Sequence, residues 1–319
     1  MVRAGRAALR PTTPVLAQMV VTRRCNLTCG YCNEYDTFSP PVPTATLLQR
    51  IDHLASLGTV ILTLTGGEPL LHPDLDKIIA HAVSKGMVTT SITNGFPLTK
   101  SWIERLNAAR LTLLQVSVDN LYPNEISDKS FSKIVDKLEL LRDNAKFSVN
   151  VNAVLGSSNK EETRQVVRDV RALGFFMTVG LLHDHAGQID PGLLGNSLAE
   201  LYDEMRATSH KSLFHRSGEG WERTLIENGD AVWKCRAGAR YLYIDENGVV
   251  SYCSQRRGEP GIGILDYGRD EITRAFNAPK GCEARCTLAC VRRASAFDGW
   301  RAQDGAPVTA VVSPAAPTS

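Results

Sequence analysis

The stretch CNLTCGYC, residues 25–32, places three cysteines on one short segment. It follows an apolar, β-rich run at 15–21, so it forms the loop after the first predicted strand. A structural zinc site is closed by four protein ligands, whereas three cysteines on a four-iron cluster leave one iron open to another ligand. Cys25, Cys29 and Cys32 therefore indicate a metal site, either an iron–sulfur cluster or a zinc site completed by a distant histidine or cysteine.

Strand-like and helix-like patterns alternate from this first strand to about residue 210. The predicted strands are 15–21, 60–65, 88–93, 113–118, 147–155 and 176–182. The predicted helices are 44–57, 73–85, 100–110, 132–144, 159–173 and 197–208. Six strand–helix units in series imply a parallel sheet with right-handed crossovers. Since a full eight-unit barrel needs about 250 residues, we expect an α/β fold with a partial (βα)6 TIM-like barrel.

A second motif, TGGEPLL at residues 65–71, ends the second predicted strand. Ligands of such folds bind at the C-terminal ends of the strands, so this motif shares a barrel mouth with the cysteine loop. Its two glycines let the backbone approach a ligand closely, and Glu68 can pair with an ammonium group. An ordinary strand-to-helix turn is the alternative.

The two motifs, in this order, resemble those of the radical S-adenosylmethionine (SAM) enzyme superfamily, and the resemblance extends over residues 15–210. It implies a [4Fe–4S] cluster on Cys25, Cys29 and Cys32, an adenine contact at Tyr31, and a loop that holds the methionine amino group at Gly66, Gly67, Glu68 and Pro69. SAM would chelate the open iron, and its reductive cleavage would give a 5′-deoxyadenosyl radical that abstracts hydrogen from substrate.

Polar residues at other strand ends are further candidates. In similar enzymes such residues contact the SAM ribose and carboxylate, so we expect this role for Asn94, Ser117 and Asn152, with capping or turn roles as the alternative. The sequence His183, Asp184, His185 follows the sixth strand. It is a candidate general base or substrate contact, or else a solvated loop.

Five more cysteines lie near the C-terminus, at Cys235, Cys253, Cys282, Cys286 and Cys290. Two short strands at 241–245 and 249–253, joined by Glu-Asn-Gly, predict a hairpin that brings the first two thiols to one side. If 282–290 is helical, its three thiols share one face. The pattern resembles the SPASM/twitch extensions of radical SAM enzymes, which implies one auxiliary [4Fe–4S] cluster. Five thiols leave one over, as an alternate ligand, a hydrogen-atom donor or an inert cysteine.

Composition excludes several other classes of protein. Eight cysteines could form four disulfides, but clusters of thiols in a chain without an export signal favour metal ligation in a reducing, cytoplasmic compartment. No apolar run could cross a membrane, and a net charge of +2 gives no indication of nucleic-acid binding. The expected organisation is a disordered N-terminus (1–14), a radical SAM barrel (15–210), a linker (211–232), an iron–sulfur domain (233–304) and a disordered tail (305–319).

We expect a radical SAM enzyme that acts on a peptide or protein by crosslinking, epimerisation or oxidation. A dehydrogenase or related enzyme for a small molecule, such as a sugar or aminocyclitol, is the first alternative, and a non-catalytic iron–sulfur or zinc protein is the second. The first strand begins near residue 15, so we expect no additional N-terminal peptide-recognition domain. A separate peptide-binding partner could supply that function, and the resemblance implies a flavodoxin- or ferredoxin-type electron donor.

Overall fold

A computed structural model describes residues 10–184, 186–206 and 220–299. His185, residues 1–9, the end of the sixth predicted helix, residues 211–219 of the predicted linker, residues 300–304 and the whole predicted tail lie outside these residues. Thr13 is buried already, and the predicted linker contains the helix Trp221–Asn228.

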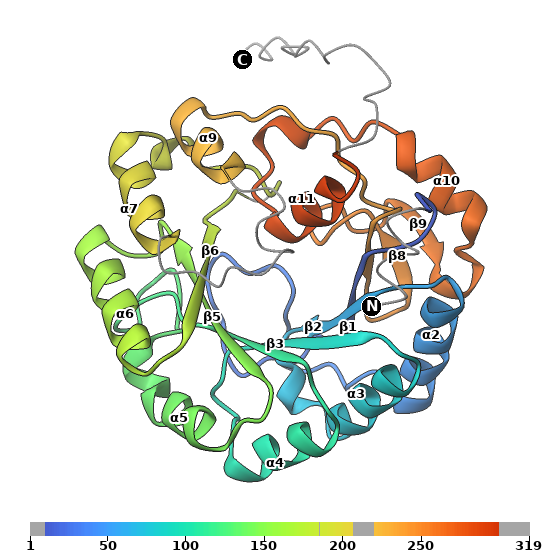
Figure 1. Cartoon of the computed structure of the whole chain (residues 1–319), viewed down its shortest axis with the longest axis horizontal. Helices are drawn as coiled ribbons and strands as arrows, with labels where there is room; N and C mark the ends of the chain where they lie inside the picture. Colours follow the sequence, from blue (N-terminus) through green and yellow to red (C-terminus); the bar gives the residue numbers. More distant parts are fainter. Residues whose placement is uncertain (1–9, 185, 207–219, 300–319) are drawn as a thin grey trace.

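Six parallel strands, each followed by a helix, build a partial TIM barrel (Figure 1). The strands are β1 (Leu16–Thr22), β2 (Ile61–Gly66), β3 (Val88–Thr93), β4 (Leu113–Ser117), β5 (Ser148–Leu155) and β6 (Phe176–Leu181). The helices are α2 (Thr44–Ser56), α3 (Leu75–Ser84), α4 (Lys100–Ala108), α5 (Phe131–Asn144), α6 (Lys160–Ala172) and α7 (Asn196–Arg206). They lie outside the strands, as in the predicted α/β architecture (Figure 1).

The barrel core lies between the strands and this outer layer of helices. Leu62 and Leu64 of β2 and Leu75 and Ile78 of α3 are all completely buried in it. Each such side chain stabilises the fold by about 1.5–3 kcal/mol relative to an exposed one. Local signals set the helix ends: the Asn159 side chain accepts the backbone N–H of Glu162 at 2.9 Å and so begins α6.

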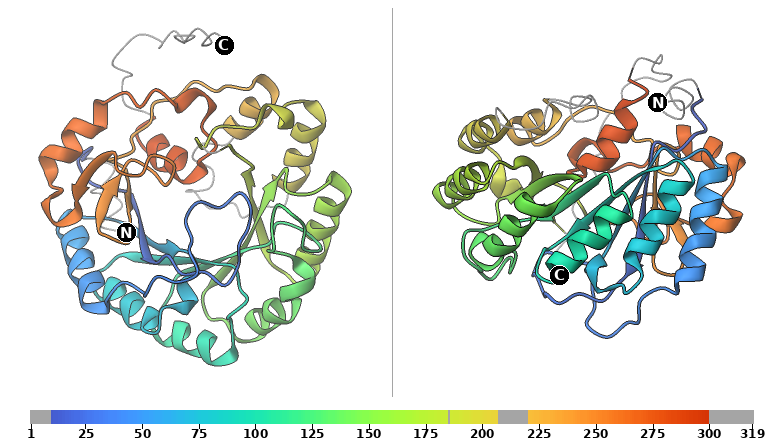
Figure 2. Two further views of the ribbon diagram at one scale, coloured as in Figure 1. Left: turned by 180° about the vertical axis from the view of Figure 1, so that it is seen from behind. Right: turned by 60° about the horizontal axis from the view of Figure 1, so that its bottom comes forward.

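The C-terminal region continues the same sheet. The predicted hairpin is confirmed as β7 (Tyr241–Ile244) and β8 (Val249–Ser251), which pair antiparallel. β7 also pairs parallel to β1, and β9 (Pro260–Gly263) adds to β8. In the described part of the chain the sheet therefore has nine strands, in the order β6-β5-β4-β3-β2-β1-β7-β8-β9. Figure 2 shows the orange hairpin directly beside the dark-blue β1. The sequence did not predict this attachment, because it depends on a pairing between residues more than 200 positions apart.

Short helices complete the C-terminal region. They are α9 (Trp221–Asn228), α10 (Arg269–Asn277) and α11 (Ala289–Ala296), with the 3-10 turns η3 (Ile264–Asp266) and η4 (Glu283–Arg285). Two other 3-10 turns, η1 (Pro69–Leu71) and η2 (Pro191–Leu193), follow β2 and β6 in the barrel. The conditional prediction of a helix over 282–290 is wrong. η4 ends at Arg285, the following Cys286 has an extended backbone and forms a bridge with Gln188, and α11 begins only at Ala289.

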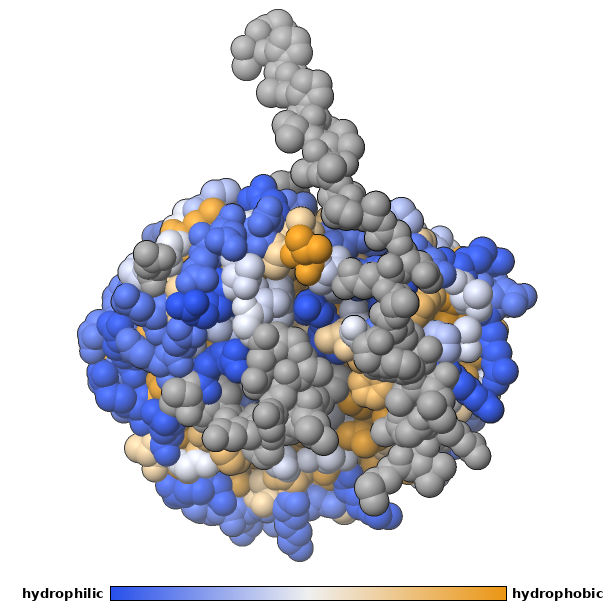
Figure 3. Space-filling model, turned by 45° about the horizontal axis from the view of Figure 1, so that its top comes forward, coloured by the Kyte–Doolittle hydropathy of each residue, from blue (hydrophilic) through white to orange (hydrophobic). Residues whose placement is uncertain are grey.

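The face of the molecule in Figure 3 is mainly hydrophilic, with small hydrophobic areas between the polar ones. In the part of the chain that the structure describes, every helix is too short or too polar to cross a bilayer.

One buried ion pair anchors the end of α11 to β7. The Arg240 guanidinium donates to both carboxylate oxygens of Asp298, at 2.6 and 2.7 Å, and both side chains are at most 1% exposed. Its remaining nitrogen donates to the carbonyls of Arg10 and Thr13 at 2.8 Å. The Arg240 side chain therefore joins the N-terminal segment, β7 and the C-terminal helix.

Replacing Arg240 with methionine is expected to lower the free energy of unfolding by about 3–5 kcal/mol, because Asp298 stays buried without the guanidinium. Urea denaturation measures this loss. The matched control is Arg223→Met: its ion pair with Asp203 (2.8 Å) is half-exposed, so we expect a loss under about 1 kcal/mol. Equal losses for the two variants would contradict the buried-pair argument.

Candidate active site

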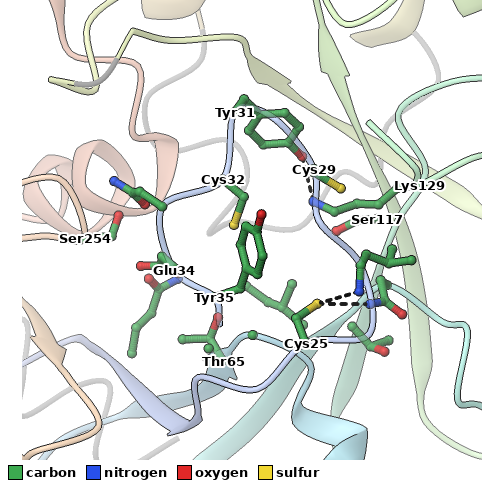
Figure 4. Close-up of a pocket in the computed structure, with 18 of the residues that line it drawn as sticks. Cys25, Cys29, Tyr31, Cys32, Glu34, Tyr35, Thr65, Ser117, Lys129 and Ser254 are labelled. Atoms are coloured by element: carbon green, nitrogen blue, oxygen red, sulfur yellow. Dashed lines mark hydrogen bonds between the residues drawn. The ribbon is translucent and has the colours of Figure 1, made fainter. Parts of the chain in front are cut away.

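A pocket of about 230 Å³ opens at the C-terminal ends of the barrel strands, where the cysteine loop meets the C-terminal region. Cys25, Cys29 and Cys32 all line it, so the structure brings the three predicted ligands to one site (Figure 4). Ser254 and Leu288, from the loops that carry the second set of cysteines, line the same pocket. The pocket therefore lies between the two sets of thiols.

Hydrogen-bond donors point at the sulfurs of the first set. The backbone N–H of Leu27 lies 3.4 Å from Cys25 Sγ, and Asn94 Nδ2 lies 3.7 Å from the same atom (Figure 4). The Ser127 hydroxyl lies 3.6 Å from Cys29 Sγ. Burial raises the pKa of the Cys25 thiol, and the Leu27 N–H opposes that effect. Donors of this kind stabilise thiolates, so the arrangement fits cysteines that ligate a cluster.

The glycine loop lies against the end of β1. Gly67 donates its N–H to the carbonyl of Thr22 at 2.8 Å, and Glu68 donates its N–H to the carbonyl of Arg24 at 2.9 Å. A Cβ at Gly66 would come within 2.1 Å of the Thr22 oxygen. The two glycines are therefore required for close contact with the segment that leads into the cysteine loop, in addition to any contact with a ligand.

The Glu68 carboxylate is completely buried and accepts three hydrogen bonds from the chain itself. Leu70 N–H and the Thr93 hydroxyl donate to Oε1 at 2.9 and 2.7 Å, and Asn94 N–H donates to Oε2 at 2.7 Å. These bonds tie the glycine loop to the end of β3. Within the described residues, Gly66, Gly67 and Asn94 line the pocket, but Glu68 and Pro69 do not. Pairing between Glu68 and an ammonium group stays a prediction.

Glu68 gives the stability of the protein a pH dependence. Burial raises the pKa of its carboxyl to about 7, against the opposing effect of the three donors. A raised carboxyl pKa means that the folded protein binds the proton more tightly, so stability falls as pH rises from the unfolded value near 4.5 through 7. We expect the unfolding free energy of the wild type to fall by roughly 3 kcal/mol relative to Glu68→Gln across this range.

Urea denaturation of the metal-free protein at several pH values measures this difference. Glu68→Gln also places an amide nitrogen opposite a backbone donor, which we expect to cost roughly 1–3 kcal/mol at every pH. That constant cost does not alter how the unfolding free energy changes with pH. Parallel pH profiles for wild type and variant would contradict the prediction.

A partly buried cation at the pocket, with a side chain that is 19% exposed, is the residue that sequence reasoning missed. Lys129, in the loop before α5, lines the pocket and donates from Nζ to the Tyr31 hydroxyl at 2.6 Å (Figure 4). Tyr31 donates in turn to Asp119 Oδ2 at 2.8 Å, and Ser127 donates to the same oxygen at 2.7 Å. Asp119 and Tyr31 raise the pKa of Lys129, which keeps it charged despite its burial. No local motif marks Lys129, since its hydrogen-bond partner Tyr31 is 98 positions away in the sequence.

The remaining predicted residues divide between the pocket and its surroundings. Ser117 and His183 line the pocket. Asn152 is not among its lining residues; its Oδ1 accepts from Thr178 at 2.9 Å between β5 and β6. The Asp184 side chain is exposed, and its carboxylate accepts backbone N–H groups of its own loop. His185 lies outside the described residues.

The second set of cysteines lies on four segments around β7 and β8. Cys235 precedes β7, Cys253 follows β8, Cys282 and Cys286 flank η4, and Cys290 is in the first turn of α11. Burial raises the pKa of Cys235 to about 12 and that of Cys253 to about 11.

The spacing of the thiols is wider than a single ion requires. Among the described residues, no three Cys, His, Asp or Glu side chains are close enough to hold one metal ion. A four-iron cluster binds each thiolate on a different iron, so the thiols stand farther apart than around one ion. Ligation of a cluster by either set stays a prediction.

The barrel, the cysteine loop and the glycine loop together define the class of protein. The family model described as the Radical SAM superfamily matches residues 19–170. The chain belongs to this superfamily and is therefore an enzyme of a family that uses a [4Fe–4S] cluster and SAM.

Three known proteins illustrate the range of its relatives. The chain is 28% identical over 311 residues to the AdoMet-dependent heme synthase of Methanosarcina barkeri. The alignment covers 86% of this chain and 88% of the synthase. It is 31% identical over 176 residues to the PqqA peptide cyclase of Methylocella silvestris, in an alignment that covers 53% of this chain and 47% of the cyclase. The fold is similar to that of Streptococcus suis SuiB bound to precursor peptide SuiA, with a TM-score of 0.65, 17% identity and coverage of 84% and 66%. The chain thus spans about half of the cyclase and about two thirds of SuiB.

Proposed function

We propose that this radical SAM enzyme modifies a peptide or protein, by crosslinking, epimerisation or oxidation of a residue, and that it carries one auxiliary [4Fe–4S] cluster. The observation that carries the proposal is that both cysteine loops line the same pocket. A substrate there would lie between the SAM cluster and the auxiliary cluster. The polar side chains of Asn33, Ser254 and Gln255 on the pocket wall suit the amide groups of a peptide.

The residues of the barrel side would hold the cofactors. Cys25, Cys29 and Cys32 would ligate the SAM cluster, with the surrounding donors orienting their sulfurs. Lys129 and Ser117, on the same wall, offer a cation and a hydroxyl to the SAM carboxylate. When bound, the cluster and SAM supply the 5′-deoxyadenosyl radical that abstracts hydrogen from substrate.

Two of the relatives support a peptide substrate. One is by name a PqqA peptide cyclase, and SuiB is bound to a precursor peptide. The second candidate function is conversion of a small molecule. It is favoured by the AdoMet-dependent heme synthase, which matches this chain over most of both lengths. An auxiliary cluster beside the pocket suits either function, because it can accept the second electron of an oxidation.

The test uses the anaerobically reconstituted full chain with SAM and dithionite. We expect 5′-deoxyadenosine to form, and short peptides encoded beside its gene to increase that formation and to change mass. Mass spectrometry of each peptide gives the readout, with the wild-type enzyme lacking SAM as the control. Stimulation by sugars, aminocyclitols or porphyrins, and by none of the peptides, would reject a peptide substrate in favour of the second candidate.

A further inference from the structure

We propose that Glu34 binds the substrate, and that its carboxylate receives the positively charged nitrogen of a lysine or arginine side chain in the peptide. This inference rests on the proposed peptide substrate and deepens it. Glu34 comes two positions after the third cysteine of the first set, and it lines the pocket. Its fixed position, an oxygen that lacks a partner and the charges around it point to this role.

The backbone around Glu34 is held in place from two sides. Arg23 Nη2 donates to the carbonyls of Asn33 and Tyr35, at 3.4 and 3.2 Å. The Asn33 side chain donates from Nδ2 to Gln255 Oε1 at 2.9 Å, in the loop after β8. Glu34 therefore lies where the cysteine loop meets the C-terminal region, at a fixed position of the pocket wall.

This wall lies across the pocket from the side proposed to hold SAM. Glu34 and Ser254 are on one side of the close-up in Figure 4, and Lys129 and Ser117 are on the other. Lys129 and Ser117 are the groups offered to the SAM carboxylate, so Glu34 is placed for the substrate rather than for the cofactor.

One oxygen of the Glu34 carboxylate lacks a hydrogen-bond partner. Among the described residues, no donor reaches Oε1, although this atom is shielded from solvent. Tyr243 offers a hydrogen bond to the same side chain, but Oε1 stays unpaired. A buried acceptor without a partner costs free energy. Since both oxygens share the negative charge, a cation bound on the pocket side of the carboxylate would offset that cost.

The arginines near Glu34 are bound to other acidic residues. Two guanidinium groups each lie within 4.0 Å of two carboxylates, in the pairs Arg23–Asp36, Arg23–Glu246, Arg257–Glu246 and Arg257–Asp245. The guanidinium of Arg50 donates to backbone carbonyls of the same group, at 3.1 and 3.4 Å. Together with Glu34, the group has four carboxylates and three guanidinium groups, so one negative charge is in excess.

The pocket wall also suits the hydrocarbon part of a basic side chain. Tyr35 and Leu288 line the pocket together with Glu34. Lysine and arginine lay their apolar stems along such surfaces and place their charged ends at polar groups. An acidic side chain would add to the excess negative charge, and a neutral one would leave it unpaired. The site therefore favours a basic residue of the peptide.

Binding of model peptides to the anaerobically reconstituted full chain, with SAM present, tests this role. The peptides are acetyl-Gly-Gly-X-Gly-Gly-amide, in which X is lysine or arginine or, as a neutral counterpart of similar shape, norleucine or citrulline. Calorimetry at millimolar peptide measures the affinities. We expect the wild type to bind each basic peptide about 10- to 100-fold more tightly than its neutral counterpart. In Glu34→Gln this ratio should fall to about 1.

The matched control is Glu125→Gln. Glu125 is exposed on the loop beside the cysteine loop and is not among the residues that line the pocket. Its substitution removes the same charge near the pocket, so a general effect of charge would lower the ratio in both variants. We expect Glu125→Gln to keep the wild-type ratio. The preference of the wild type needs no variant, so it tests the proposal even if Glu34→Gln does not fold.

Three results would overturn the assignment. If the wild type bound basic and neutral peptides equally, or if Glu34→Gln kept the wild-type ratio, Glu34 would not recognise a basic residue, although the peptide substrate would stand. If Glu34→Gln lost affinity for SAM and kept the ratio, the carboxylate would serve the cofactor. If the wild type bound none of the peptides, the proposed peptide substrate would be rejected, and this inference with it.

Discussion

The Cys29→Ser variant is expected to form no 5′-deoxyadenosine above the level of an enzyme-free control. Cys29 is 5% exposed at the pocket, and the Ser127 hydroxyl is directed at its sulfur. Serine supplies a hydroxyl where the proposed cluster needs a thiolate, and only three cysteines are available on that loop. Chromatographic measurement of 5′-deoxyadenosine after reduction with dithionite gives the result.

The matched control is Cys253→Ser, which removes a thiol from the second set. We expect this variant still to cleave SAM, while its iron content falls by about four per chain. Cys29→Ser should lose a similar amount of iron from the first set. If Cys29→Ser retained SAM cleavage, or if both variants lost it equally, the separate roles of the two sets would be wrong.

The Gly67→Ala variant is expected to lose about 5 kcal/mol or more of stability, or to fail to fold. A Cβ at this position would come within 2.2 Å of the Arg23 oxygen and 2.4 Å of the Arg24 oxygen. Both are backbone atoms of the segment leading into the cysteine loop, so relief requires that segment to move. Thermal denaturation measures the loss of stability, and 5′-deoxyadenosine formation should be lost with it.

Gly180→Ala is the control for a glycine in a parallel strand. Its Cβ would meet its nearest neighbour, Val154, at 3.7 Å, which is ordinary contact. We expect a change in stability within about 1 kcal/mol. Similar losses for Gly67→Ala and Gly180→Ala would mean that the cost comes from adding a side chain at any glycine of the barrel, rather than from the contact with the Arg23 and Arg24 backbone.

Sequence patterns predicted most of the barrel, because each strand–helix unit is largely specified by local signals. The predicted strand 88–93 has the same bounds as β3, and the predicted helix 159–173 differs from α6 by one residue at each end. Apolar runs set the strands, and the Asn159 cap sets the start of α6. The three cysteines and the two glycines could be located at one mouth because all follow neighbouring parallel strands.

The features that the sequence did not predict depend on contacts between residues that are distant in the sequence. Lys129 is held at the pocket by a hydrogen bond to Tyr31 and an ion pair with Asp119, and no sequence motif predicts these contacts. The internal partners of Glu68 come from η1 and from the end of β3, so its burial could not be predicted from the glycine motif alone. The bridge to Gln188 holds Cys286 in an extended conformation, and this tertiary pairing overrides the helical spacing of the last three cysteines.

The pairing of β7 with β1 also bears on how far the chain can be shortened. β1 is an interior strand only because β7 covers one of its sides. Cutting the chain before β7 would leave a long, apolar strand with unpaired backbone groups, a template for pairing with other chains. We therefore expect the barrel alone to aggregate rather than to serve as a minimal SAM-cleaving enzyme. The cysteine-rich C-terminus would then protect the barrel from self-association, whatever it contributes to the chemistry.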